Sequence, residues 1–178
     1  MMVKKWSQMC RQEIRRCFAG WSRPAMLIGA FAMMVAGWLT RSVCGSPNQQ
    51  GIMLQFGDQI PPVWVMTVLW TLWYLILGGM VGGIMSDRRE NGWEAVCRYR
   101  GALLFLCMAF LGFLWYPVFF VCARFFVAAI MLLLVLACCG GCAWFYAKAS
   151  RLVGGVLLVH AVFLLWLLVI NVKIAFLN

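Results

Sequence analysis

The stretch Pro61–Gly79, PPVWVMTVLWTLWYLILGG, decides how the rest of this chain has to fold. It contains no charged residue, and the apolar run that it begins continues to Met85. That length is sufficient for an α-helix to cross the hydrocarbon core of a bilayer. The Pro pair suits a helix start, because the first N–H groups of a helix have no intrahelical partner to lose. We therefore expect a membrane-spanning helix from Pro62 to Met85.

The composition extends this interpretation to the whole chain. Of the 178 residues, 65% are hydrophobic and the mean hydropathy is +0.92, whereas soluble domains are about half apolar. Four further apolar stretches are each long enough to cross as a helix, which satisfies its own backbone in lipid. They are Pro24–Thr40, Gly101–Cys122, Phe125–Tyr146 and Leu152–Val172. The predicted fold is an all-α membrane protein, a five-transmembrane-helix bundle over residues 24–178.

A basic segment, residues 1–23, precedes the bundle. Apolar and aromatic residues recur in it at spacings of three or four: Trp6, Cys10, Ile14, Cys17 and Trp21. This periodicity, with six basic residues around it, predicts an amphipathic helix that lies on the membrane surface. The alternative is a disordered basic tail.

The charges indicate membrane topology. The net charge is +10, but the basic residues fall between apolar spans, which favours contact with the lipid bilayer over nucleic acid. Twelve of the 15 Lys and Arg residues would lie on the side of the N-terminus, and three, Arg41, Arg124 and Lys173, on the other. The positive-inside rule then predicts a cytoplasmic N-terminus and an external C-terminus in the cell membrane.

Two aromatic motifs carry a resemblance to a known family. Residues 60–66, IPPVWVM, are followed by WTLWY at 70–74 and by Gly78, and residues 110–120 read FLGFLWYPVFF. With five short spans and ten Trp, these motifs resemble the TspO/translocator protein family, also called TspO/MBR, tryptophan-rich sensory proteins or peripheral-type benzodiazepine receptors. The chain looks like a divergent bacterial-type member over residues 24–178.

The resemblance has departures in the third and fifth spans. Gly112 stands where the family has Asn, which removes a polar group that would bond a ligand. In the fifth span, residues 159–163, VHAVF, stand for Pro-Tyr-x-x-Trp, and residues 169–171, VIN, stand for Tyr-Leu-Asn. Trp166 lies one turn beyond the position of the family's Trp.

The resemblance implies a receptor or sensor that binds tetrapyrroles, protoporphyrin IX or haem, in a Trp-lined cavity. Two alternatives stay open: a light-dependent enzyme that degrades bound porphyrin, and a transporter of small amphiphilic molecules. We expect no catalytic residue, no resident metal and no required cofactor, so the porphyrin or haem would be a ligand. Motifs such as HExxH and GxSxG are absent, and so are carboxylates inside the spans, the usual mark of proton-coupled transport.

The expected pocket lies between the loop at 41–61 and spans two, three and five. Its candidate walls are Pro61, Pro62, Trp64, Trp70, Trp115, Phe163 and Trp166. Trp70 matches a cavity-lining position of the family, and a planar ligand needs large flat walls. Trp64 matches a position near the cavity mouth, or it anchors the helix at the membrane interface, the role that we expect for Trp38.

His160 is the only histidine of the chain and falls inside a span. Polar residues in spans usually face the bundle interior or a cavity. Three roles stay open: a bond to a porphyrin carboxylate, ligation of the porphyrin's metal, and a hydrogen bond between helices.

Small residues form two further patterns. Cys138, Cys139 and Cys142 form CCGGC, in which the CxxC spacing suggests metal or redox chemistry, but without a second pair the pattern favours small-residue packing. Residues 78–83 contain two overlapping Gly-x-x-x-Gly pairs, which indicate close helix packing either within the bundle or in a homodimer.

Overall fold

A computed structural model of the chain describes residues 20–44, 63–87 and 92–177. Five helices in this part of the chain are long and apolar enough to cross a membrane. They are α2 (Arg23–Cys44), α3 (Val63–Ser86), α4 (Gly92–Phe120), α5 (Phe125–Ala149) and α6 (Arg151–Leu177). The predicted five-span, all-α fold is confirmed, and the protein is a multi-pass integral membrane protein. The expected surface helix at 1–23 falls almost entirely outside the described residues.

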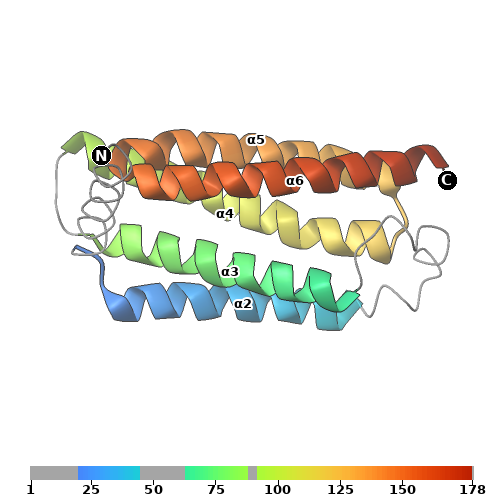
Figure 1. Cartoon of the computed structure of the whole chain (residues 1–178), viewed down its shortest axis with the longest axis horizontal. Helices are drawn as coiled ribbons and strands as arrows, with labels where there is room; N and C mark the ends of the chain where they lie inside the picture. The colour runs from blue at the N-terminus through green and yellow to red at the C-terminus, as the bar shows by residue number, and fades with distance from the viewer. Residues whose placement is uncertain (1–19, 45–62, 88–91, 178) are drawn as a thin grey trace, which may run out of the picture.

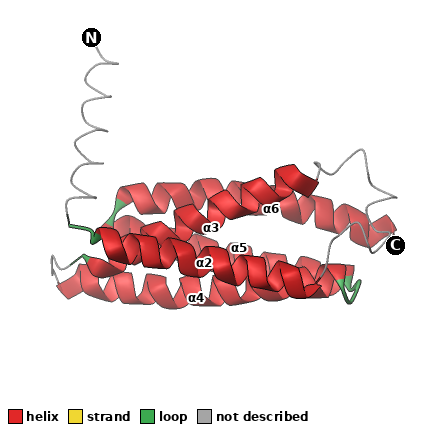
Figure 2. Cartoon of the chain, turned by 90° about the horizontal axis from the view of Figure 1, so that it is seen from below, coloured by secondary structure: helices red, strands yellow, loops and turns green. Residues whose placement is uncertain are grey.

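The helices lie along one common axis and alternate in direction (Figure 1). Helix α2 packs along α3, while α4 packs along α5 and α5 along α6. Contacts of α2 with α4 and of α3 with both α4 and α6 join the α2–α3 hairpin to the other three helices. Figure 2, seen from below, shows α2 drawn over α3, α4 and α5 along the length of the bundle. The junction between the hairpin and the other three helices is where the site lies.

Glycines bring α2 and α3 into backbone contact. A Cβ atom added at Gly78 would collide with the backbone carbonyl of Gly29, and one added at Gly82 would collide with the carbonyl of Ala25. Gly83 lies against the ring of Trp21 in the same way. Small residues at such spacing let helices approach closely in a membrane. The glycine stripe therefore packs helix against helix within the chain, one of the two roles that the sequence left open.

Helix α4 begins at Gly92, nine residues before the predicted start of the third span. The sequence prediction was wrong here because the charges of residues 92–100 suggested a loop. Arg98 is buried, and its guanidinium donates a hydrogen bond to the backbone carbonyl of Asp87, so the end of the bundle accommodates this charge inside a helix. The predicted turns are short, as expected: residues 121–124 join α4 to α5, and Ser150 alone joins α5 to α6.

Two cysteines of the CCGGC motif lie at helix contacts. Cys139 and Cys142 are fully buried, and their thiols lie 3.4 Å from the backbone oxygens of Leu157 and Gly101. Cys139 thus packs against α6, and Cys142 packs against α4. Both act as small, weakly polar side chains between helices.

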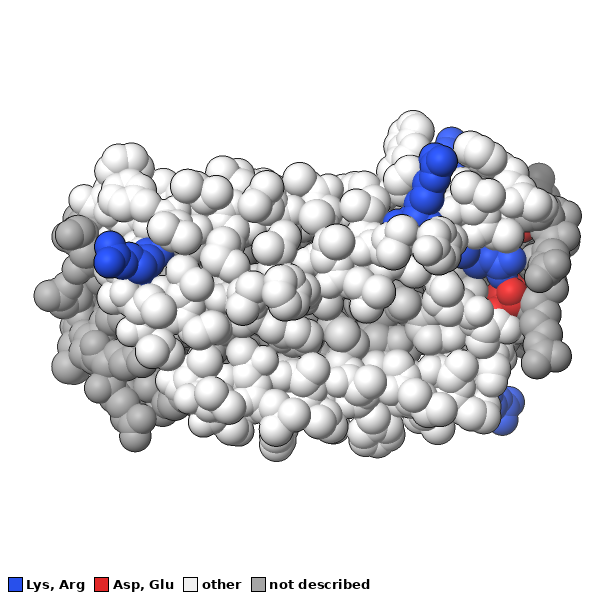
Figure 3. Space-filling view, turned by 180° about the vertical axis from the view of Figure 1, so that it is seen from behind, with Lys and Arg blue, Asp and Glu red and all other residues white. Residues whose placement is uncertain are grey.

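Among the described residues, charged side chains lie near the two ends of the bundle. Figure 3 shows Lys and Arg near both ends of one face, with an uncharged band between them. Large apolar side chains such as Phe31, Leu106 and Val162 are exposed on the surface of the bundle. This distribution fits a bundle surrounded by lipid, with polar groups at both interfaces.

Candidate functional site

A cavity of about 600 Å³ opens between α2, α3 and α4. Its volume falls within the range of small-molecule sites. On α2 it is lined by Gly37, Trp38, Thr40, Arg41 and Ser42; on α3 by Thr67, Trp70, Thr71 and Tyr74; and on α4 by Gly112, Phe113, Trp115 and Tyr116. On α3 these residues recur at spacings of three or four, so this helix turns one face to the cavity, whereas on α2 they fall within residues 37–42 near the end of the helix.

Aromatic rings form one wall. The ring centroids of Trp70 and Tyr74 lie 5.8 Å apart in a stacked arrangement, and Tyr74 lies 5.7 Å from Phe113 on α4. Phe163 of α6 meets Trp70 edge-on at 5.3 Å from behind. Gly37 lets this wall close against α2, because a Cβ there would overlap the ring of Tyr74. The wall is therefore aromatic, and rings from three helices contribute to it or support it.

Polar groups line the cavity toward the end of the bundle where α2 ends. The indole Nε1 of Trp38 donates to Thr71 Oγ1 at 3.2 Å, and the guanidinium of Arg41 donates to the hydroxyl of Thr67. Both bonds cross from α2 to α3. Asp87 and Glu94, the acidic residues in the described part of the chain, lie at the opposite end of the bundle. Among the described residues, Arg41 is thus a cation on the cavity wall without an acidic residue at its end of the bundle.

The inner part of the site is closed by buried polar side chains. Trp115 is 5% exposed, and its Nε1 donates to the side-chain oxygen of Asn171 at 3.0 Å when the amide is placed in the orientation that satisfies both groups. His160 is 4% exposed, and its ring centroid lies 4.6 Å from that of Trp73. The hydroxyl of Tyr116, which lines the cavity, has no hydrogen-bond partner among the described residues.

The residues expected from the sequence are only partly brought together. Trp70 and Trp115 line the cavity. Phe163 packs edge-on against Trp70, and the ring centroids of Trp166 and Phe163 lie 5.8 Å apart. Trp64 is 70% exposed near the start of α3 and does not line the cavity. Pro61, Pro62 and most of the loop at 41–61 lie outside the described residues.

The cavity and the expected pocket share two helices and differ in the third. The expectation paired spans two, three and five, whereas α2, the first span, provides one side of the cavity and α6 only supports the aromatic wall. Trp38, expected as an interfacial anchor, is 55% exposed and also lines the cavity. Sequence reasoning missed Arg41 and Thr67 as well. The helical spacing of Gly37, Trp38 and Arg41 is a signal that could have indicated this face.

No group of three or more His, Cys, Asp or Glu side chains is placed to hold a metal ion within residues 20–44, 63–87 and 92–177. The aromatic cavity is thus the principal candidate site in this part of the chain.

Comparison with protein families gives one match: residues 24–177 match the model of the TspO/MBR family. Comparisons with curated proteins and with solved structures give no match.

Proposed function

The chain belongs to the TspO/MBR family, and from this premise we propose that it is a membrane receptor that binds tetrapyrroles such as protoporphyrin IX or haem. The proposed site is the cavity between α2, α3 and α4. The observation that carries the proposal is the combination, in one cavity, of an aromatic wall and one cation.

The aromatic wall suits the macrocycle. A tetrapyrrole is a large, flat and mostly apolar ring, and aromatic side chains offer matching flat surfaces at little cost in conformational entropy. The rings of Trp70 and Tyr74 stack on each other with 27° between their planes, and together they form an aromatic face of the cavity. Ring contacts from Phe113 and Phe163 hold this face in place.

The polar groups suit the carboxylates. Protoporphyrin and haem carry two propionates on one edge of the ring. A guanidinium forms strong, directional hydrogen bonds to carboxylates. Arg41 lies on the cavity wall near the end of α2, where a propionate would remain close to the membrane interface. The hydroxyl of Tyr116, which has no partner among the described residues, is a further hydrogen-bonding group in the same cavity.

The test is a titration of the purified full chain in detergent with protoporphyrin IX, followed in the dark by quenching of Trp fluorescence. We expect saturable quenching with one site per chain, and the same titration with empty detergent micelles and free N-acetyltryptophanamide corrects for non-specific quenching. Quenching that grows without saturation would contradict the proposal. Loss of porphyrin absorbance under light, only in the presence of the protein, would favour the enzymatic alternative.

A further inference from the structure

A second, smaller cavity of about 40 Å³ adjoins the first. Both cavities are lined by Trp70, Tyr74, Gly112, Phe113 and Trp115. The smaller one is also lined by His160 and Leu164 of α6 and by Met108 of α4. It is large enough for one small polar group, since a cavity needs about 10–15 Å³ to hold a water molecule.

His160 lines this inner cavity and has an unpaired polar atom. The residue is 4% exposed, and its Nδ1 has no hydrogen-bond partner within the described residues. The rings nearest to it are those of Trp73 and Phe163, at centroid distances of 4.6 and 6.1 Å. A buried polar group without a partner is costly, and inside a membrane such groups usually serve a ligand or another buried group. The imidazole therefore lacks a partner that a ligand would supply.

Gly112 lies where the two cavities meet. It lines both, and a Cβ atom added there would have no other atom within 4 Å. The space beside its Cα is therefore open, and any larger side chain would project into it. Gly112 thus adds no side chain between the large cavity and the inner cavity that His160 lines.

Arg41 and His160 lie at two different depths along the bundle. Arg41 bonds to Thr67, while His160 packs on Trp73, six residues further along α3. Six residues of an α-helix span about 9 Å along its axis. A ligand whose carboxylates meet Arg41 would thus direct its opposite edge toward His160.

We propose that Gly112 and His160 form an inner subsite that accepts a hydrogen-bonding substituent on the edge of the ligand opposite its carboxylates. The subsite selects, among tetrapyrroles, those with a hydroxyalkyl group over those with an alkyl group at that edge. This inference rests on the proposed function, since the outer cavity must first bind the macrocycle.

The test compares haematoporphyrin, which has hydroxyethyl groups at the edge opposite its propionates, with mesoporphyrin, which has ethyl groups there. Dissociation constants are measured by fluorescence quenching for the parent chain and for His160→Phe. We expect the ratio of the two constants to favour haematoporphyrin about two- to tenfold more in the parent than in His160→Phe, the range of one net hydrogen bond. Comparing ratios removes the difference in how the two porphyrins partition into detergent.

Gly112→Leu provides a second, independent variant. It should lower the haematoporphyrin preference to that of His160→Phe, because its side chain closes the route to the inner cavity. Gly140→Leu is the matched control: its Cβ also meets nothing within 4 Å, but the residue is exposed on α5, so the preference should stay at the parent value.

The outcomes separate the two proposals. If both porphyrins bind and neither variant lowers the preference for haematoporphyrin, the proposal of an inner subsite is wrong and the proposed function stands. If neither porphyrin binds the parent chain, both are wrong. Should His160→Phe fail to fold, as judged by circular dichroism, Gly112→Leu decides the question alone.

Discussion

The indole nitrogen of Trp115 on α4 lies 3.0 Å from the side-chain amide of Asn171 on α6, and the same amide lies 3.0 Å from the backbone oxygen of Phe125 at the start of α5. One buried side chain thus joins three helices. Asn171 is 1% exposed, so both bonds lie out of reach of water. Trp115 is also a wall of the cavity, which makes this amide a positioning group for the site.

We expect Asn171→Leu to destabilise the bundle by about 1–3 kcal/mol, because it leaves an indole N–H and a carbonyl unpaired and membrane hydrogen bonds contribute about 0.6–1.7 kcal/mol each. Denaturant unfolding in detergent, followed by Trp fluorescence, measures the loss. A double-mutant cycle with Trp115→Phe isolates the bond between the two side chains. A coupling energy of zero in that cycle would show that the two groups do not interact.

Gly78→Leu should destabilise the α2–α3 hairpin by at least about 1–3 kcal/mol, the usual cost of overpacking. The new side chain would meet the backbone of Gly29, which cannot yield unless the helices separate. Gly155→Leu is the matched control, because a Cβ added at Gly155 would have no atom within 4 Å and the residue is exposed on α6. Thermal unfolding in detergent compares the two; equal melting temperatures would contradict the close packing.

The fold could be predicted from the sequence because the patterns that determine it are local. The length of an apolar run measures directly whether a helix can span the bilayer, and short connections force neighbouring helices to be antiparallel. The start of α4 was predicted too late because a charge usually indicates exposure, while the burial of Arg98 depends on its bond to Asp87, a contact that no local pattern shows.

The site was less predictable because it depends on contacts between helices. The aromatic spacing in α3 indicated Trp70, but nothing in α2 alone shows that Trp38 and Arg41 lie opposite Thr71 and Thr67. That pairing follows from the depth at which Gly29 and Gly78 meet, which fixes the register of the hairpin.

Arg41→Gln should weaken mesoporphyrin binding about tenfold or more, because hydrogen bonds to a charged group contribute about 1.5–3 kcal/mol. Lys173→Gln is the control, since it removes a charge that is exposed at the same end of the bundle. The dimethyl ester of mesoporphyrin, which has no carboxylate, should bind the parent and Arg41→Gln alike. An equal loss for acid and ester would mean that Arg41 supports the fold and does not bind the carboxylate.

The distribution of Lys and Arg predicts a cytoplasmic N-terminus and an external C-terminus if the protein resides in an inner membrane. A fusion of alkaline phosphatase, active only outside the cytoplasm, after the last residue should be active, and a fusion after Lys148 at the end of α5 should be inactive. Green fluorescent protein at the same two positions should give the inverse pattern. Fluorescence from the C-terminal fusion would reverse the assigned orientation.

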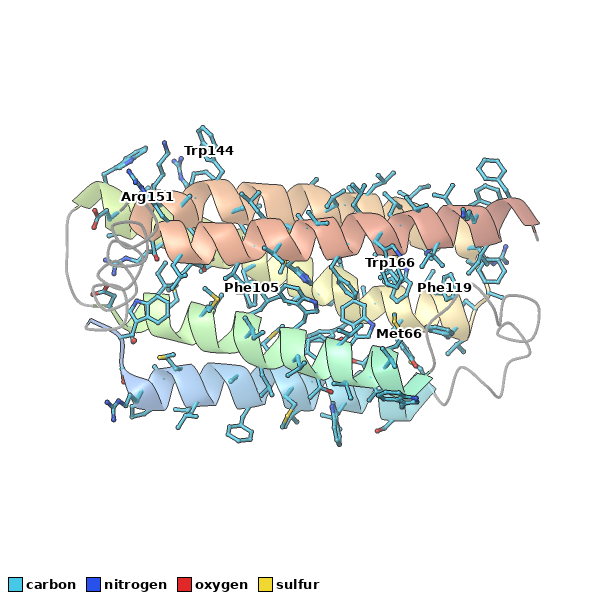
Figure 4. All side chains as sticks on the ribbon, in the orientation of Figure 1. Met66, Phe105, Phe119, Trp144, Arg151 and Trp166 are labelled. Carbon is cyan, nitrogen blue, oxygen red and sulfur yellow. The ribbon has the colours of Figure 1, made fainter. Side chains whose placement is uncertain are left out.

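Trp70→Ala should weaken porphyrin binding by about 1–3 kcal/mol, taking the stacking of a nucleic-acid base on an aromatic side chain as the nearest measured analogue. At the upper end this is more than a hundredfold in the dissociation constant. The control is Trp144→Ala, because Trp144 is 65% exposed on α5 beside Lys148 and projects away from the bundle (Figure 4). Trp38 cannot serve as the control, since it lines the same cavity.

Variants of two residues of α6 extend this prediction to a ranking of binding losses. Phe163→Ala should cause a smaller loss than Trp70→Ala, because Phe163 supports the ring of Trp70 edge-on and does not line the cavity. Trp166→Ala should cause the smallest loss, since Trp166 does not line the cavity and contacts Phe163, which itself supports the wall. The order Trp70, Phe163, Trp166 in dissociation constants, measured on variants with unchanged circular dichroism, would support the cavity as the porphyrin site. A folded Trp70→Ala variant that binds porphyrin like the parent would instead assign this aromatic cluster to helix packing.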